Sequence, residues 1–292
     1  MKPSALQAIR RLIVAVVPVF TLAACTGPGA ERIAAFELSD EPLIGKFVWH
    51  DLITDDPAAA RRFYGGLFGW SFEAATHPNG GDYTLIRRDD RYVGGIVELA
   101  DPNDADYSRW LGYLSVADVD GALAATRDAG GNAVAGPLDL GEVGRAAVIE
   151  DPQGAVVGLL RSRHGDPVDA ARGGAGAIVW NELLAADAVD ATVFYGALAG
   201  LESVEQQRPG GVYRVLRAQG RDRAGILPRP NDNVRPLWLT HFAVADVARA
   251  AERVTALGGT VLVAPNPEVR DGLFAVVTDP TGALLALRQR TP

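Results

Sequence analysis

The sequence has 292 residues, enough for about two domains, and its 48% hydrophobic and 22% charged residues exclude disordered, collagen-like and coiled-coil chains. The formal net charge of −8, with no run of basic residues, argues against a nucleic-acid partner. The single cysteine excludes an intrachain disulfide and a zinc site built from several cysteines.

Residues 1–24 have the pattern of a secretory signal peptide. Three basic residues precede an apolar run over residues 12–24, which is too short to span a bilayer comfortably. The Leu-Ala-Ala-Cys sequence ending at Cys25 resembles the lipobox of bacterial lipoproteins, so Cys25 is expected to carry a lipid anchor. Because Thr26 follows the cysteine in place of Asp, the resemblance implies the outer membrane, facing the periplasm. Residues 25–43 are then expected to form a flexible tether.

An internal repeat determines the expected architecture. The sequence Val-Trp-His-Asp-Leu at 48–52 aligns with Val-Trp-Asn-Glu-Leu at 179–183, and the Asp-Pro-x-Gly-Ala turn that begins at Asp151 recurs at Asp279. The repeat predicts two homologous modules, at 44–164 and 175–290. A short segment rich in Gly, Asp and Pro joins them.

Each module divides again into two similar units. In the first module, the predicted elements in chain order are a strand at 47–53, a helix between Asp56 and Gly69, strands at 82–87 and 91–99, a strand from 110, a helix at 119–129, and strands at 146–149 and 156–160. The second module follows the same order. The sequence therefore predicts an α+β fold of four βαβββ units.

This pattern resembles the vicinal oxygen chelate superfamily, which includes glyoxalase I, bleomycin-resistance proteins and extradiol dioxygenases. The resemblance rests on the Val-Trp-His-Asp-Leu strand, the Phe-Tyr-Gly sequence at 63–65, the Val-Ala-Asp-Val turns at 116–119 and 244–247, and both Asp-Pro-x-Gly-Ala turns. It implies two glyoxalase-like modules whose curled mixed sheets surround a cavity. It also implies a divalent metal held by side chains that face inward.

The resemblance implies metal ligands on the first and last strands of each unit. In chain order these slots hold His50 and Glu98, Tyr113 and Gly158, Asn181 and Pro228, and His241 and Ala286. If the first unit pairs with the fourth, then His50, Glu98 and His241 form one site for Fe, Mn, Ni, Co or Zn. If the units pair in sequence, these ligands are divided between two sites. Trp49, next to the first slot, is a candidate for stacking on a substrate.

The resemblance leaves the biochemical role open between three classes. The leading hypothesis is a lipid-anchored, metal-dependent enzyme of isomerase, lyase or dioxygenase type, acting on a small substrate with vicinal oxygens. The alternative is a non-catalytic protein that binds or sequesters a small molecule, as bleomycin-resistance relatives do. A third hypothesis is a scaffolding lipoprotein with a vestigial site. A monomer is expected because the duplication supplies both partners of each unit pair.

Four residues that recur between the modules have a simple structural interpretation. Trp110 and Trp238 are expected in the hydrophobic core. Asp151 and Asp279 precede proline in tight turns, and that geometry accounts for them without any catalytic role.

Overall fold

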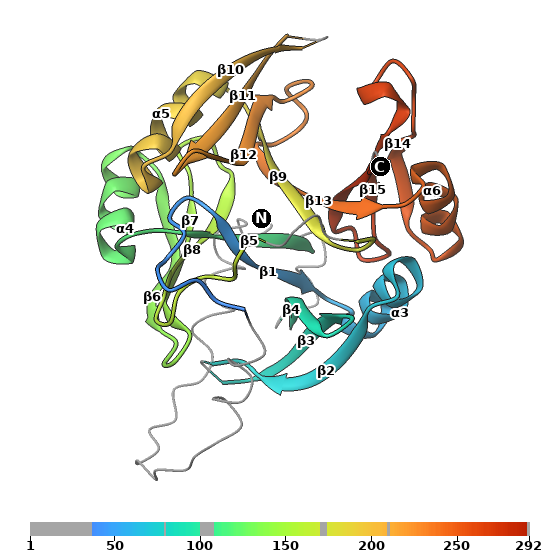
Figure 1. Ribbon diagram of the computed structural model, residues 1–292, viewed down its shortest axis with the longest axis horizontal. Coiled ribbons are helices and arrows are strands. Elements are labelled where there is room, and N and C mark those ends of the chain that lie inside the picture. The colour runs from blue at the N-terminus through green and yellow to red at the C-terminus, as the bar shows by residue number, and fades with distance from the viewer. Residues whose placement is uncertain (1–36, 79, 100–107, 170–173, 209–210, 291–292) are drawn as a thin grey trace, which may run out of the picture.

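The computed structural model describes residues 37–78, 80–99, 108–169, 174–208 and 211–290 (Figure 1). The predicted signal peptide and the lipidation site Cys25 lie outside these residues. Within the part of the chain that the structure describes, no helix is both long enough and apolar enough to cross a membrane.

The elements confirm the four βαβββ units. The first module contains β1 Phe47–Thr54, α3 Pro57–Phe68, β2 Ser71–Thr76, β3 Asp82–Arg88, β4 Arg91–Glu98, β5 Arg109–Ser115, α4 Val119–Asp128, β6 Asn132–Asp139, β7 Gly144–Glu150 and β8 Val156–Ser162. The second contains β9 Ile178–Ala185, α5 Ala188–Ala199, β10 Glu202–Arg208, β11 Gly211–Ala218, β12 Arg221–Pro228, β13 Leu237–Val244, α6 Val247–Ala256, β14 Thr260–Val263, the short 3₁₀ helix η2 Arg270–Gly272, β15 Phe274–Thr278 and β16 Leu284–Gln289.

Each module forms one eight-stranded mixed sheet. The strand orders are β2-β3-β4-β1-β5-β8-β7-β6 and β10-β11-β12-β9-β13-β16-β15-β14. The two units of a module meet where β1 runs antiparallel to β5, and again where β9 runs antiparallel to β13. The sheets therefore pair units in sequence, first with second and third with fourth.

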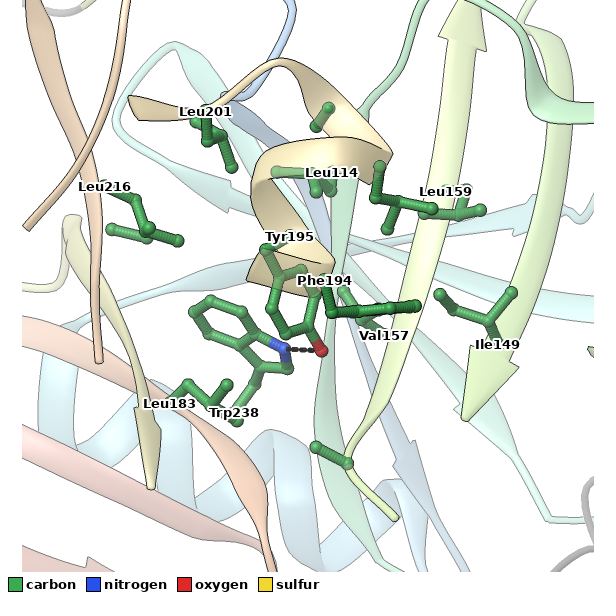
Figure 2. Close-up of a cluster of buried hydrophobic side chains, with 14 of the residues drawn as sticks. Leu114, Ile149, Val157, Leu159, Leu183, Phe194, Tyr195, Leu201, Leu216 and Trp238 are labelled. Carbon is green, nitrogen blue, oxygen red and sulfur yellow. Dashed lines mark hydrogen bonds between the residues drawn. The ribbon is translucent and has the colours of Figure 1, made fainter. Parts of the chain in front are cut away.

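The hydrophobic cores pair the units differently. Helix α3 packs beside α6, and α4 beside α5 (Figure 1). Phe63 and Tyr64 of the first unit share a buried cluster with Phe242 and Val254 of the fourth. A second cluster joins the second and third units, and Figure 2 shows Tyr195 of α5 among side chains of both modules. Burial of each such large side chain contributes about 2 kcal/mol, so these shared cores hold the modules together.

Helix starts follow the sequence closely. The carboxylate of Asp56 accepts a hydrogen bond from the backbone N–H of Ala59, which satisfies one of the free donors at the start of α3. Gly69 ends the same helix in the left-handed conformation at φ 73°, where a side chain would be strained. Asp118 caps α4 in the same way, as predicted.

The repeated turns connect the modules. Asp279 accepts hydrogen bonds from the backbone N–H groups of its own turn and from the hydroxyl of Tyr64 at 3.0 Å. Tyr64 in turn accepts a hydrogen bond from Trp110 Nε1 at 2.9 Å. In the second core, Trp238 Nε1 donates to the hydroxyl of Tyr195 (Figure 2). Tyr195 in turn donates to Asp151. The core and turn interpretations are thus confirmed, and the turns also carry buried hydrogen bonds across the module interface.

Candidate functional site

The side chains of β1 alternate between two environments. Trp49, Asp51 and Ile53 line a cavity on one face of the first sheet. Leu52 packs into the core on the other face, and His50 forms a hydrogen bond on the side of the second module. Asp51, rather than His50, is therefore the polar residue that the first strand presents to the cavity.

The cavity of the first module has a volume of about 750 Å³. Apolar side chains from all eight strands of the first sheet make up much of its wall, among them Ile53, Leu85, Leu111, Val148 and Leu160. Such a size and lining suit a small organic molecule. Within this wall, Asp51 is 3% exposed, so a carboxylate is buried beside space that a ligand could fill.

Aromatic donors surround the Asp51 carboxylate. The hydroxyl of Tyr83 donates to Oδ1 at 2.6 Å, and Trp49 Nε1 donates to the same oxygen at 2.9 Å. Burial raises the pKa of Asp51, while the hydrogen bond from Tyr83, the charge of His77 and the hydrogen bonds from Trp49 and Tyr113 act in the opposite direction. Burial and the negative charge of Asp51 raise the pKa values of Tyr83 and Tyr113, which keeps both phenols neutral.

Two glycines make room for these phenols. A Cβ atom on Gly95 would lie 1.8 Å from the hydroxyl oxygen of Tyr83, and one on Gly158 would lie 2.3 Å from the ring of Tyr113. Neither position can accept a side chain without displacing a tyrosine. Gly158 occupies one of the predicted ligand slots, and the close approach of Tyr113 explains why that slot holds no side chain.

The second module places different groups at the equivalent points. Glu182 corresponds to Asp51, and His241 to Tyr113. His241 is fully buried, and its Nε2 lies 3.5 Å from Oε2 of Glu182. Nη2 of Arg270 donates to both carboxylate oxygens of Glu182, at 2.7 and 2.8 Å. The Arg270 guanidinium also lies over the ring of Phe274, 4.6 Å from its centre.

Arg270 reaches Glu182 from the short helix η2. Arg270 and its neighbour Asp271 both adopt left-handed conformations, at φ 50° and 57°. Burial alone would raise the pKa of Glu182, but His241 and Arg270 outweigh burial and lower it to about 2. Burial lowers the pKa of His241, so this imidazole is neutral near pH 7. The second site therefore contains a carboxylate already paired with a cation of the chain itself.

The structure does not bring the three predicted metal ligands together. Nε2 of His50 lies 2.9 Å from Oδ1 of Asn181, and burial lowers the pKa of His50 to about 4. Glu98 is the exposed last residue of β4 and lines the first cavity. His241 contacts Glu182 in the other sheet. The reason is that the first and fourth units share a core but not a sheet. The substrate-binding candidate Trp49 does line the first cavity.

Comparison with known proteins decides the family. Residues 44–159 match the Glyoxalase/Bleomycin resistance protein/Dioxygenase superfamily, and residues 177–287 match the Glyoxalase-like domain. A Mycobacterium tuberculosis protein that carries the provisional name glyoxylase CFP32 is 33% identical over 249 residues, which cover 84% of this chain and 94% of the relative. The chain belongs to the glyoxalase superfamily. The predicted resemblance to the vicinal oxygen chelate proteins is thereby confirmed.

Other known proteins share sequence or fold with the chain. The anthracycline biosynthesis protein DauV of Streptomyces sp. strain C5 is 30% identical, over 85% of this chain and 95% of the relative. The Mn(II)-bound glyoxalase from Novosphingobium aromaticivorans has a TM-score of 0.54 at 17% identity, covering 84% of this chain and 82% of that one. The 2,3-dioxygenase LapB from Pseudomonas sp. KL28 has a TM-score of 0.55 at 14% identity, covering 87% and 94%. These two structures show the shared fold.

The divalent metal implied by the resemblance to this superfamily does not fit the described side chains. Among the residues whose placement is described, no group of three or more His, Cys, Asp and Glu side chains could hold a metal ion. The first cavity offers the carboxylate of Asp51 with neutral phenol and indole donors around it. In the second module, Arg270 engages both oxygens of Glu182. A mononuclear site of this chemistry commonly needs three protein ligands.

Sequence reasoning missed Asp51, Tyr83, Glu182 and Arg270. One signal in the repeat could have found Asp51 and Glu182, because the position after His50 is acidic in both modules whereas His50 itself aligns with Asn181. No comparable signal points to Arg270, which lies in the short helix η2 between β14 and β15.

Proposed function

We propose that this protein binds a small, largely apolar organic molecule in the cavity of the first module, and that it acts as a binding or sequestering protein of its superfamily. The observation that carries this proposal is the cavity of about 750 Å³ with the buried carboxylate of Asp51 in its wall. Apolar walls supply the burial energy, and one polar group sets the orientation of the bound molecule.

The named relatives support a ligand of this kind. DauV and DnrV, both 30% identical to the chain, are named anthracycline biosynthesis proteins. Anthracyclines are fused-ring aromatic compounds, and a fused aromatic body suits the apolar lining of the first cavity. Trp49, Tyr83 and Tyr113 offer rings on which it can stack.

Filling the cavity tests the proposal. Val97 is half-buried in β4 and lines the cavity, so Val97→Trp should occupy the space without disturbing the core. Leu227→Trp, at the equivalent place in β12, is the matched control. We expect fused aromatic compounds to quench tryptophan fluorescence and raise the melting temperature of the wild type and of Leu227→Trp. Val97→Trp should lose both effects. Equal binding by Val97→Trp would contradict the proposal.

The second candidate is a metal-dependent enzyme, supported by the name glyoxylase of the mycobacterial relative. Metal analysis of the full protein purified without chelator separates the two candidates. Under the binding proposal we expect far less than one metal ion per chain, unchanged in His50→Ala, Glu98→Ala and His241→Ala. A near-stoichiometric metal content that falls in these variants would favour the enzyme.

We also propose that lipid at Cys25 anchors the protein in the outer membrane. The lipobox-like ending of the signal and Thr26 after the cysteine support this location. Cys25→Ser should abolish labelling by fatty acid and release the protein from the membrane fraction. Labelling that persists in this variant would contradict the proposal.

A further inference from the structure

The charged side chains that line the first cavity are mainly acidic. The acidic lining residues are Asp51, Asp82, Glu98 and Glu142, and the histidines are His77 and His164. The described lining includes no lysine and no arginine, although the chain has 28 of them. His164 lies 2.8 Å from a carboxylate oxygen of Glu142, so the two pair when the histidine is protonated. The cavity therefore attracts positive charge and repels negative charge.

Among the residues that the structure describes, the deepest of these charges, on Asp51, forms no ion pair with a lysine or an arginine. In this part of the chain, the only basic side chain that acts on it is His77, whose positive charge, when present, lowers the pKa of Asp51. Tyr83 and Trp49 donate to Oδ1 of Asp51, and both donors are neutral. A carboxylate can accept about four hydrogen bonds, so Asp51 can still accept one from a ligand. Burial of this carboxylate is costly even with His77 nearby, because burial is the largest influence on its pKa, and a cation that enters the cavity would offset that cost.

The repeat shows how the same fold neutralises this carboxylate elsewhere. The spacing of 128 residues that relates Asp151 to Asp279 also relates Glu142 to Arg270. In the second module, Arg270 pairs with the carboxylate of Glu182. In the first module, the corresponding residue is itself an acid, and it lines the cavity. The first module thus has a carboxylate where the second has the neutralising guanidinium.

Aromatic rings near Asp51 add a second attraction for a cation. Trp49, Tyr83, Tyr92 and Tyr113 all line the cavity. The faces of such rings attract organic ammonium groups, most strongly where water is excluded. A carboxylate among aromatic rings suits a protonated amine attached to an apolar body.

We propose that the natural ligand of the first cavity is an organic cation, with an apolar aromatic body that fills the cavity and a protonated amine directed at Asp51. This inference rests on the proposed function and narrows it, because it states the charge of the ligand.

Three acridines of nearly equal size test the charge preference on the full protein. At neutral pH, 9-aminoacridine is a cation, acridine is neutral and acridine-9-carboxylate is an anion. Titration followed by fluorescence and calorimetry should give a dissociation constant for 9-aminoacridine about tenfold below that for acridine, which follows from one favourable charge contact. The anion should bind more weakly than acridine.

A matched pair of variants locates the preference. Asp51→Asn keeps an oxygen that Tyr83 and Trp49 can donate to, and it should bring the two dissociation constants close to each other. Asp190→Asn removes the same charge from an exposed site in the first turn of α5, and it should leave the preference unchanged. Thermal unfolding checks that both variants are folded. If Asp51→Asn does not fold, the three probes on the wild type still decide the question.

The outcomes separate the two proposals. Equal binding of the cation and the neutral probe, or tighter binding of the anion, would overturn the cation inference and leave the cavity as a binding site. Charge preference retained in a folded Asp51→Asn would overturn the role of this carboxylate. Binding of none of the three probes would contradict the proposed function itself, and the inference with it.

Discussion

The two modules place a carboxylate at the same point of the same fold and surround it in opposite ways. In the first module, Asp51 faces a cavity of about 750 Å³ and receives hydrogen bonds from neutral donors. In the second, Arg270 pairs with Glu182 and His241 lies beside it. The first arrangement is open to a ligand, while in the second the chain supplies its own cation.

This difference shows what a duplication allows. Both modules contribute many buried side chains to each of the shared cores, so neither can lose its fold without harm to the other. Only one of them needs a cavity for binding. The ion pair of Glu182 with Arg270 gives the second site a structural role, and the burial of both carboxylates makes their different surroundings measurable.

The largest effect should follow from removal of Arg270. Arg270→Ala leaves Glu182 buried without its cation, and the expected loss in the free energy of unfolding is about 4 kcal/mol. Denaturant unfolding near pH 7 measures it. Arg221→Ala removes an exposed arginine that pairs with Asp169, and it should cost less than about 1 kcal/mol. Equal losses in the two variants would show that Arg270 is not a neutralising partner.

Acid should weaken the second site in a defined pH window. The pKa of Glu182 falls from 4.5 to about 2 on folding, so its ionised form stabilises the protein above pH 4.5. That contribution, about 3 kcal/mol, is lost as the pH falls toward 2. Glu182→Gln should therefore be less stable than the wild type near pH 7, and the difference should shrink below pH 4.5. A difference independent of pH would contradict the assignment.

Removing the tyrosine hydroxyl from the hydrogen-bonded chain in either core should lower the free energy of unfolding by the same amount. Tyr64→Phe and Tyr195→Phe each leave one buried carboxylate oxygen and one indole N–H without a partner, at a cost of about 2 kcal/mol. Unfolding of the two variants under one set of conditions checks the symmetry. Losses that differ by more than about 1 kcal/mol would show that the two cores are not equivalent.

The smallest expected effect is a gain in stability rather than a loss, and it concerns Asp51. Burial raises the pKa of Asp51 above 3.8, so its ionised form opposes folding near neutral pH. In the absence of ligand, Asp51→Asn should be about 1 kcal/mol more stable than the wild type at pH 7. The gain should disappear as the pH falls below 3.8, where the wild-type carboxyl group is protonated in both states. If Asp51→Asn were instead less stable than the wild type at pH 7, the two buried carboxylates would not differ as proposed, because Glu182→Gln is also expected to be less stable.

The fold could be predicted well from the sequence because local patterns mark the helices and strands and the internal repeat gives the order of the units. Asp56 and Asp118 cap helices where the pattern places them, and the repeat gives the order of the units. The strands β2 and β6 lie at the edges of the first sheet and carry less regular patterns, so they were expected only from the unit count.

The site was predicted less well, for two physical reasons. Side chains of a strand alternate between faces, so an error of one residue exchanges His50 for Asp51, and the pairing of β1 with β5 shifts register between Phe47 and Trp49. Which units share a sheet and which share a core is also a long-range property that no local pattern contains. The predicted union of the first and fourth units occurs in the core that holds Phe63 and Phe242.

The shared cores also order events during synthesis. The first unit leaves the ribosome before the others, yet Phe63 and Tyr64 complete their packing only against residues of the fourth unit, close to the end of the chain. The core between the second and third units can form earlier, because its parts are nearer in sequence. We therefore expect the core of the second and third units to form first and the core of the first and fourth units to form last. Until the strands of the fourth unit have been made, the apolar face of α3 has no partner to pack against and must be protected from aggregation.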